Sequence, residues 1–313
     1  MLHLSKARTF VLLASLLGLT GCLFRSRKVE REATTTPLKS ATQQELIDQI
    51  NQQAEKIQTL QATVDIDTSV GGIRRGKVTD YQEIRGYVLA RKPAMLRMVG
   101  LLPVVRNRAF DMVSDGKFFK LWIPPKNRFV TGRNDLEVTN PKMALENVRP
   151  QSIYEALLIN PIEAGQEIAV LENSNETVLD SRRHRVDQPA YELLVLRQGA
   201  KGWFLSRKII FSRTDLEPHR QLIYDQRGDL VTDVKYEQYS NHDGIWYPGQ
   251  TEIWRPVEEY DITLNVVKLE LNKPLKDEQF ELAQPPGAEV VHLGETSVGN
   301  VAGDPPSAAN HKP

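Results

Sequence analysis

Short hydrophobic segments separated by turn residues fill most of this chain and constrain its fold more than any other feature. From Gln61 onward the segments are rich in Val, Ile and aromatic residues, which favour strands. Asp115-Gly116 and Asp243-Gly244 are typical of tight hairpins. Because connections this short join antiparallel neighbours, we predict a meander of strands at 61–69, 81–91, 94–100, 106–114, 118–124, 128–132, 167–173, 190–198, 203–213, 219–226, 229–240, 245–255 and 259–271.

Two helices are expected beside these strands. Thr42-Gln43-Gln44-Glu45 has the pattern of a capping box, and apolar residues follow it at helical spacing. A second such pattern, Ser152-Ile153-Tyr154-Glu155, precedes another apolar stretch. A sheet of about a dozen strands curls on itself. We therefore predict a mainly β fold, an unclosed antiparallel barrel of about 11–13 strands whose concave side is covered by helices at 42–60 and 152–159.

A secretion signal is expected at the start of the chain. Lys6 and Arg8 precede an apolar run, and Leu19-Thr20-Gly21-Cys22 follows it, an order typical of signal peptides. Cys22 is the single cysteine, so the sequence offers no disulfide framework. The alternatives are an ordinary signal peptide or a buried free thiol. These residues resemble the lipobox of bacterial lipoproteins, which implies cleavage before Cys22 and a lipid anchor on Cys22.

The remaining sequence suggests the domain boundaries. We expect a signal peptide at 1–21, the acylated cysteine and a flexible tether at 22–40, one folded domain at 41–283 and a disordered tail at 284–313. Basic and acidic residues balance at 40 each. This balance disfavours a nucleic-acid partner. No later apolar run approaches the ~20 residues of a membrane-spanning helix.

Three motifs resemble a known family. The segment from Gly86 to Arg97 (Gly-Tyr-Val-Leu-Ala-Arg-Lys-Pro-Ala-Met-Leu-Arg), the hairpin Ser114-Asp115-Gly116-Lys117 and the later Pro285-Pro286-Gly287 are similar to the bacterial lipoprotein-localisation superfamily. That superfamily comprises the periplasmic carrier LolA and the outer-membrane receptor LolB. The resemblance implies an open barrel with a helical lid around an apolar cavity that holds acyl chains.

The resemblance also implies roles for particular residues. An anchor at Cys22, followed by Leu23, favours an outer-membrane lipoprotein whose domain lies in the periplasm. The carrier has an arginine before its strand-joining proline that ties the lid shut, and Lys92 takes that place here. Lysine lacks the planar fork of arginine. Lys92 is the candidate for the lid latch by its position, and the two-bond contact of an arginine latch is not expected from it.

The loop after residue 100 is unusually apolar. A hairpin loop is normally polar, but this one reads Gly-Leu-Leu-Pro-Val-Val. The family's receptor reaches the membrane with a leucine in a protruding loop at this place. Leu101, Leu102 and Val104 are therefore candidate membrane-contact residues. The alternative is that the loop folds back onto its own core.

Strand alternation identifies candidates for the inner face. The expected cavity residues are Ile84, Val88, Leu96, Met98, Phe110, Met112, Leu121 and Ile123 from the strands, with Leu157 and Leu158 from the second helix. A simply packed core explains the same pattern, so both interpretations stay open.

No motif indicates covalent chemistry. The sequence has neither His-Glu-x-x-His, nor Gly-x-Ser-x-Gly, nor a phosphate-binding loop. We expect no enzyme, no metal and no cofactor. The expected function is to bind acyl chains of a lipoprotein or another lipid and to transfer them to or from the outer membrane. The partners would be these acyl chains, the membrane and a periplasmic carrier, with the protein a monomer. The alternative is an envelope scaffold that binds a protein partner through a solid barrel.

Overall fold

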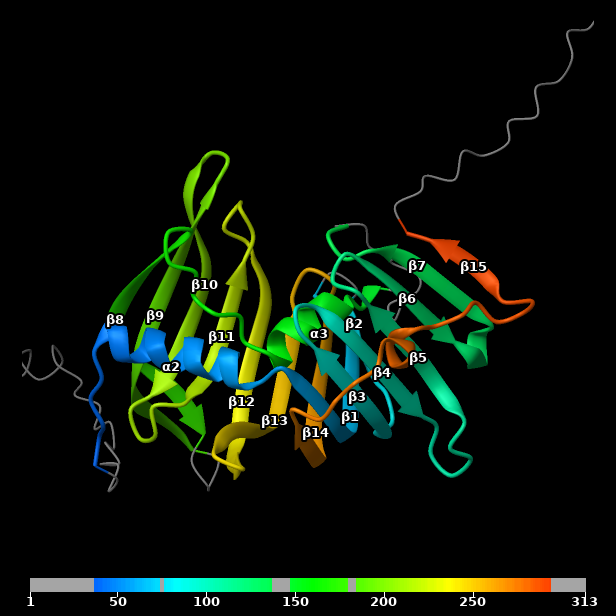
Figure 1. Cartoon of the computed structure of the whole chain (residues 1–313), viewed down its shortest axis with the longest axis horizontal. Helices are drawn as coiled ribbons and strands as arrows, with labels where there is room; N and C mark the ends of the chain where they lie inside the picture. Colours follow the sequence, from blue (N-terminus) through cyan, green and yellow to red (C-terminus); the bar gives the residue numbers. More distant parts are fainter. Residues whose placement is uncertain (1–36, 74–75, 137–146, 180–183, 294–313) are drawn as a thin grey trace, which may run out of the picture. The chain divides into compact units, whose positions relative to one another are not determined.

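The computed structural model describes residues 37–73, 76–136, 147–179 and 184–293 (Figure 1). Cys22, the expected signal peptide and most of the expected tether lie outside the described residues. The chain divides into two units, and the smaller comprises Met1–Pro37 with Glu176–Gln188. In its described part, Thr177 donates a hydrogen bond to Asp187. The larger unit comprises Leu38–Asn175 and Pro189–Pro313.

One sheet dominates the described residues. Its fifteen strands lie in the order β15-β7-β6-β5-β4-β3-β1-β14-β13-β12-β11-β10-β9-β8, with β2 paired to β1. They are β1 Thr59–Gly72, β2 Lys77–Asp80, β3 Ile84–Arg91, β4 Met95–Leu101, β5 Arg108–Ser114, β6 Phe118–Ile123, β7 Arg128–Arg133, β8 Glu167–Leu179, β9 Arg185–Gly199, β10 Gly202–Ser212, β11 Pro218–Tyr224, β12 Leu230–His242, β13 Ile245–Arg255, β14 Tyr260–Leu271 and β15 Glu289–His292.

The predicted fold class is confirmed, because the edge strands β15 and β8 do not meet and the sheet stays open. Every predicted strand is present, and β2 and β15 are additional. Positive φ angles at Gly116, Asp243 and Gly244 match the two predicted hairpin turns.

The strand order differs from the predicted continuous meander. β7 and β8 follow one another in the chain but lie near opposite edges of the sheet. Helix α3 (Pro150–Leu157) and residues 158–166, here called the crossover segment, connect the two edges. Two meanders therefore meet where β1 pairs with β14, from Leu60↔Leu271 to Val70↔Tyr260.

Side chains of one face stay together across the sheet. The pairing runs Leu193↔Ile209, Ile209↔Gln221, Gln221↔Val234, Val234↔Ile253 and Ile253↔Ile262. Paired residues share a face, and five of the six are apolar. This face carries the main core.

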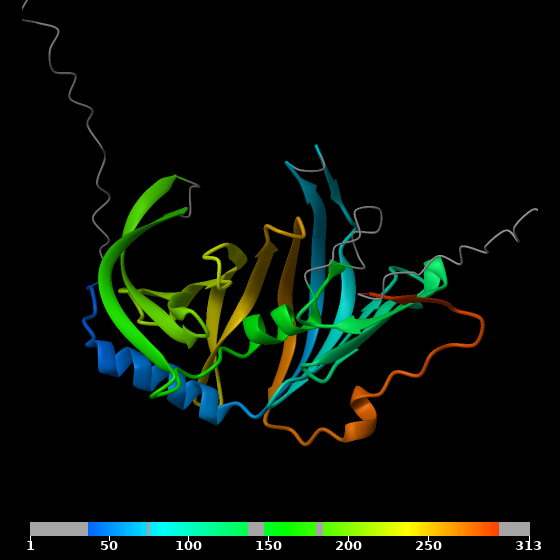
Figure 2. The same ribbon diagram turned by 90° about the horizontal axis from the view of Figure 1, so that it is seen from above.

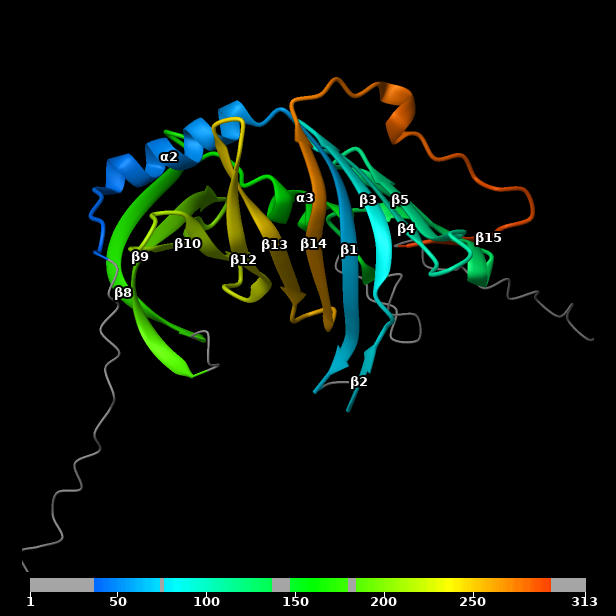
Figure 3. The same cartoon turned by 90° about the horizontal axis from the view of Figure 1, so that it is seen from below.

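Both α-helices of the described chain cover this face (Figures 1 and 2). Helix α2 (Gln43–Lys56) packs Leu46 and Ile50 against β9 and β10. Helix α3 places Ile153 and Tyr154 in the core of the middle strands. Figure 3 shows α2 near the start of β1, and β2 at the other end of that strand.

The helix boundaries correct two details. The capping box of Thr42 and Glu45 is present, but α2 ends at Lys56 and Leu60 already belongs to β1. The second capping box, predicted at 152–155, is wrong. Helix α3 begins at Pro150 without a side-chain cap, and Ser152 lies inside its first turn, because the fixed φ of proline favours it at the first helical position and starts the helix before Ser152.

The first ten residues of the expected tail, 284–293, have defined structure. Strand β15 runs parallel to β7, and Asn127 Nδ2 donates to the Gly287 carbonyl oxygen at 2.9 Å. Arg128 and Glu289 form an ion pair at 2.7 Å. These contacts cover the edge of β7, which would otherwise present unpaired backbone groups. Residues 294–313 lie outside the described residues.

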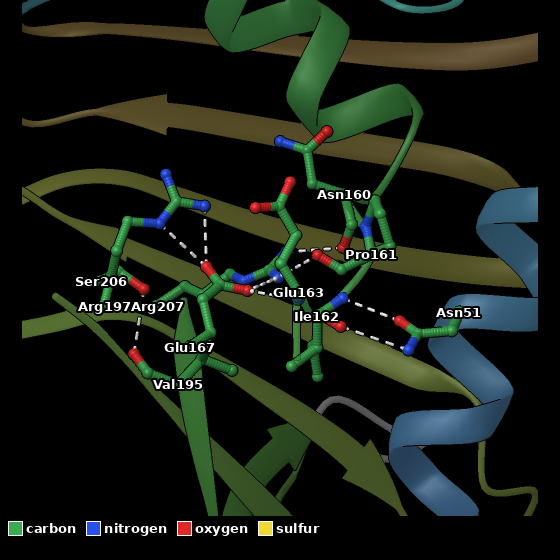
Figure 4. A network of polar contacts seen from close by, with 10 residues as sticks. All are labelled: Asn51, Asn160, Pro161, Ile162, Glu163, Glu167, Val195, Arg197, Ser206 and Arg207. Carbon is green, nitrogen blue, oxygen red and sulfur yellow. Dashed lines mark hydrogen bonds and ion pairs between the residues drawn. The ribbon is translucent and has the colours of Figure 1, made fainter. Parts of the chain in front are cut away.

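A buried ion-pair cluster holds the crossover segment on the sheet (Figure 4). Arg207 on β10 donates to the carbonyl oxygens of Asn160 and Pro161, both at 2.7 Å, and contacts Glu167 Oε2 at 3.1 Å. Arg197 reaches the other oxygen of Glu167 at 2.7 Å. The Glu167 side chain is fully buried, so its charge depends on these two partners.

Helix α2 is attached to the same segment. Asn51 Oδ1 accepts a hydrogen bond from the backbone N–H of Ile162 at 2.7 Å, and Asn51 Nδ2 donates to the Ile162 carbonyl oxygen at 3.3 Å. Figure 4 shows the side chain of Asn51 extending from α2 toward Ile162 of the crossover segment. The crossover segment therefore links α2 to β10.

We predict that Arg207→Met lowers the free energy of unfolding by about 3–5 kcal/mol, because it removes a partner of a buried carboxylate and the donor to two carbonyl groups. Urea denaturation at pH 7 measures the change. Arg197→Met is the matched control, and it should cost about 1 kcal/mol or less, because the Arg197 side chain is half exposed. Equal losses of unfolding free energy in the two variants would contradict the role of Arg207 in holding the crossover segment.

Candidate functional site: an apolar cavity and its rim

A cavity of about 250 Å³ opens on the helix-covered face of the sheet. Residues of α3 and of strands β1, β3, β4, β5, β6 and β14 contribute to it. Its lining consists of Ile66, Thr68, Tyr81, Gln82, Ile84, Met98, Leu102, Pro103, Ala109, Phe110, Met112, Leu121, Ile123, Val148, Ile153 and Ile262. None of these side chains carries a charge. Such a lining suits an apolar ligand.

The cavity has a closed end and a mouth. Met98, Met112 and Leu121 are buried, and Ile153 closes this end from α3. Tyr81 and Gln82 are exposed, so they mark the mouth. Three polar residues contribute to the lining. Thr68 lies late in β1, and Tyr81 and Gln82 lie just before β3, at the same end of the sheet.

The structure brings together most of the predicted cavity residues. Ile84, Met98, Phe110, Met112, Leu121 and Ile123 all line the cavity. Val88 and Leu96 lie on the same face but are packed in the core and do not line the cavity. Sequence reasoning missed Ile66, Thr68 and Ile153. Alternation along β1 could have identified Ile66 and Thr68, since β1 buries every second residue over most of its first half.

The space beneath α2 is filled. Leu157 and Leu158, predicted to line the cavity, instead surround a void of about 20 Å³ with Ile50, Tyr236 and Tyr247. Such a void has room for about one water molecule and none for an acyl chain. The packed-core interpretation therefore applies to this half of the interior.

Two buried tyrosines reinforce that packing. The Tyr247 hydroxyl donates to the Leu157 carbonyl oxygen at 3.0 Å. Burial raises the pKa of Tyr236 and of Tyr247 above the ordinary value, so both hydroxyls stay protonated near neutral pH. The hydrogen bond fixes the end of α3 against β13.

The three predicted loop residues point to three different places. Leu101 lies on the opposite face of the sheet, beside Leu89 and Val99. Leu102 lines the cavity together with Pro103. Val104 is 98% exposed at the tip of the loop.

Backbone hydrogen bonds close the loop. The N–H of Leu102 donates to the Asn107 carbonyl oxygen at 2.7 Å, and the N–H of Arg106 donates to the Leu102 carbonyl oxygen at 3.0 Å. Val104 and Arg106 have positive φ angles, and Val105 is also exposed. The loop from Leu102 to Asn107, here called the rim loop, therefore presents an apolar tip directly beside the cavity mouth.

Lys92, the latch candidate, contacts α2. It lies between β3 and β4, and its ammonium group donates to the Ala54 carbonyl oxygen in the last turns of α2. Burial lowers the pKa of Lys92 from its ordinary value. The neighbouring Pro93 carbonyl oxygen accepts from the Tyr154 hydroxyl of α3 at 2.7 Å. Burial raises the pKa of Tyr154 to about 12, which keeps that donor protonated. The turn between β3 and β4 thus forms hydrogen bonds with both α2 and α3.

The described residues contain no group of three His, Cys, Asp or Glu side chains arranged to hold a metal ion. No helix in the described ranges has the length and hydrophobicity to cross a membrane.

Comparison with known proteins found no matching family model and no matching curated protein. Among solved structures, the chain is similar to a DUF1329 family protein from Desulfovibrio piger (17% identity over 76% of this chain and 95% of that chain, TM-score 0.48). It is similar to a putative outer membrane lipoprotein-sorting protein domain from Vibrio parahaemolyticus (12%, 75% and 94%, 0.46). It is also similar to a LolA superfamily protein from Nitrosomonas europaea (15%, 78% and 99%, 0.45).

We predict that Lys92→Met loosens the end of α2. Loss of a charged hydrogen bond, partly offset by relief from burying the charge, should speed hydrogen exchange of the last-turn amides of α2 about tenfold. The amides of β9 and β10 should be unaffected. Lys56→Met is the control, because the Lys56 side chain is exposed. Unchanged hydrogen exchange in Lys92→Met would refute the assignment of Lys92 as the latch.

Proposed function

We propose that this protein binds acyl chains in the cavity and exchanges them with a membrane through the rim loop. One observation carries the proposal. Leu102 and Pro103 line the cavity, and the next two residues, Val104 and Val105, project into solvent. A ligand leaving the mouth therefore passes an apolar surface that can enter a bilayer.

The size of the apolar tip suits a transient contact. Burying one valine side chain stabilises by about 1.5 kcal/mol. Two valines supply roughly 3 kcal/mol, which is too little for stable attachment. Release of the rim loop from the bilayer therefore stays fast, as a transfer step requires.

The expected anchor would supply lasting attachment. An acylated Cys22 would hold the domain near a membrane and raise the effective concentration of the rim loop at its surface. In this proposal the protein is an outer-membrane lipoprotein whose domain lies in the periplasm. Its ligands are acyl chains of lipids or lipoproteins, and a periplasmic carrier protein is a candidate donor. The chemistry is non-covalent throughout.

We predict that the double variant Val104→Glu and Val105→Glu slows transfer of a fluorescent fatty acid from protein to liposomes about tenfold or more, because two charges oppose entry into the bilayer. Stopped-flow fluorescence measures the rate. Binding in the absence of liposomes should be unchanged. Val267→Glu is the control, since Val267 is a half-exposed valine on β14, outside the rim loop and the cavity lining.

Equal transfer rates for the double variant and the control would refute membrane contact through the rim loop. If no acyl ligand binds and a stoichiometric protein complex is recovered by crosslinking, the scaffold function is favoured instead.

We further predict that Cys22→Ser moves the protein from the membrane fraction to the soluble fraction. Fatty-acid affinity should stay within about twofold, because the cavity lies in the larger unit. Delivery to membranes should fall much more than binding. Retention of the variant in washed membranes would exclude an anchor at Cys22.

A further inference from the structure

The cavity volume limits how much ligand can be buried. An engineered cavity of roughly 150 Å³ holds one benzene molecule, which corresponds to about 25 Å³ per carbon atom. At that occupancy the cavity of about 250 Å³ accepts about ten carbon atoms. This is part of one acyl chain, whereas a bacterial lipoprotein carries three.

Where the described residues line it, the rest of the interior leaves no place for a second chain. The void between α2 and α3 is about 20 Å³, and Tyr247 and Leu157 are hydrogen bonded beside it. The Arg207 cluster occupies the face under the crossover segment. An additional acyl chain would have to break the contacts that hold α3.

The lining sets no preference for a charged headgroup. The polar lining residues are a hydroxyl at Thr68, a phenol at Tyr81 and an amide at Gln82, all neutral, and Tyr81 and Gln82 are exposed. A headgroup at this mouth remains hydrated. Selectivity must therefore come from the length of the buried chain.

We propose that the ligand of this protein is a single-chain amphiphile, such as a fatty acid or a monoacyl lipid, with about ten carbon atoms buried and its headgroup in solvent. This inference rests on the proposed function and narrows it. The proposed ligand differs from a lipoprotein, which carries several acyl chains.

The test is a series of saturated fatty acids from six to sixteen carbons, used below their critical micelle concentrations, that displace a fluorescent probe. Each methylene should tighten binding about fourfold while the cavity fills. The slope should break near ten carbons and flatten beyond. Decanol should bind within about threefold of decanoate, because the lining is uncharged.

Two matched variants test whether this cavity sets the chain length at which the slope breaks. Leu121→Ala enlarges the cavity and should move the break about two carbons longer. Leu96→Ala removes the same atoms from a buried leucine of the same face outside the lining, so the break should stay in place. If Leu121→Ala does not fold, Ile84→Ala at the partly buried start of β3 replaces it, with the same expected shift.

The outcomes separate this inference from the proposed function. Tighter binding of a diacyl phospholipid or a triacylated peptide than of decanoate would overturn the single-chain inference and leave acyl binding intact. A constant slope through sixteen carbons would overturn it as well. If no amphiphile binds, the proposed function itself is refuted.

Discussion

The apolar face of the sheet is the constraint on which the rest of the structure depends. Pairing keeps the side chains from Leu193 to Ile262 on one face across six neighbouring strands, so that face must be covered. Helix α2 covers β9 and β10, and α3, only eight residues long, covers part of the middle. The described helices do not fill the area lined by β1 and β3–β6. The cavity is that remainder, and its lining is apolar because the same alternation continues through these strands.

Polar contacts decide where the cover lies. A hydrophobic stripe binds any apolar surface without direction, whereas the Arg207 guanidinium donates to the Asn160 and Pro161 carbonyl oxygens only when they lie in front of its N–H groups. Asn51 and Lys92 act in the same way on α2: Asn51 binds the backbone N–H and carbonyl oxygen of Ile162 in the crossover segment, and Lys92 binds one carbonyl oxygen of the helix. A buried ion pair adds little net stability. Here it selects one position of the crossover segment, which leaves one half of the interior packed and the other open.

Much of the site was accessible from the pattern of the strands. Met98, Met112 and Leu121 were predicted because period-two alternation assigns them to one face, and they line the cavity. The same rule could not separate them from Leu96, which shares that face but is closed off by packing. The apolar loop also stood out in the sequence. Side-chain direction alternates at the end of β4, so Leu101 lies on one face of the sheet and Leu102 on the other. The chain then turns at Val104, which lies at the tip of the loop.

By itself the sequence determined the strands, the hairpin turns, the cap of α2 and the apolar face, because propensity and alternation are local properties of the chain. Only the tertiary structure decided that β1 pairs with β14, that the crossover segment carries the chain to the far edge, and that β15 covers β7. It also decided that Leu157 and Leu158 fill space while Ile153 faces an opening. These outcomes depend on the shapes of surfaces from segments far apart in the chain, and their fit is absent from any local pattern.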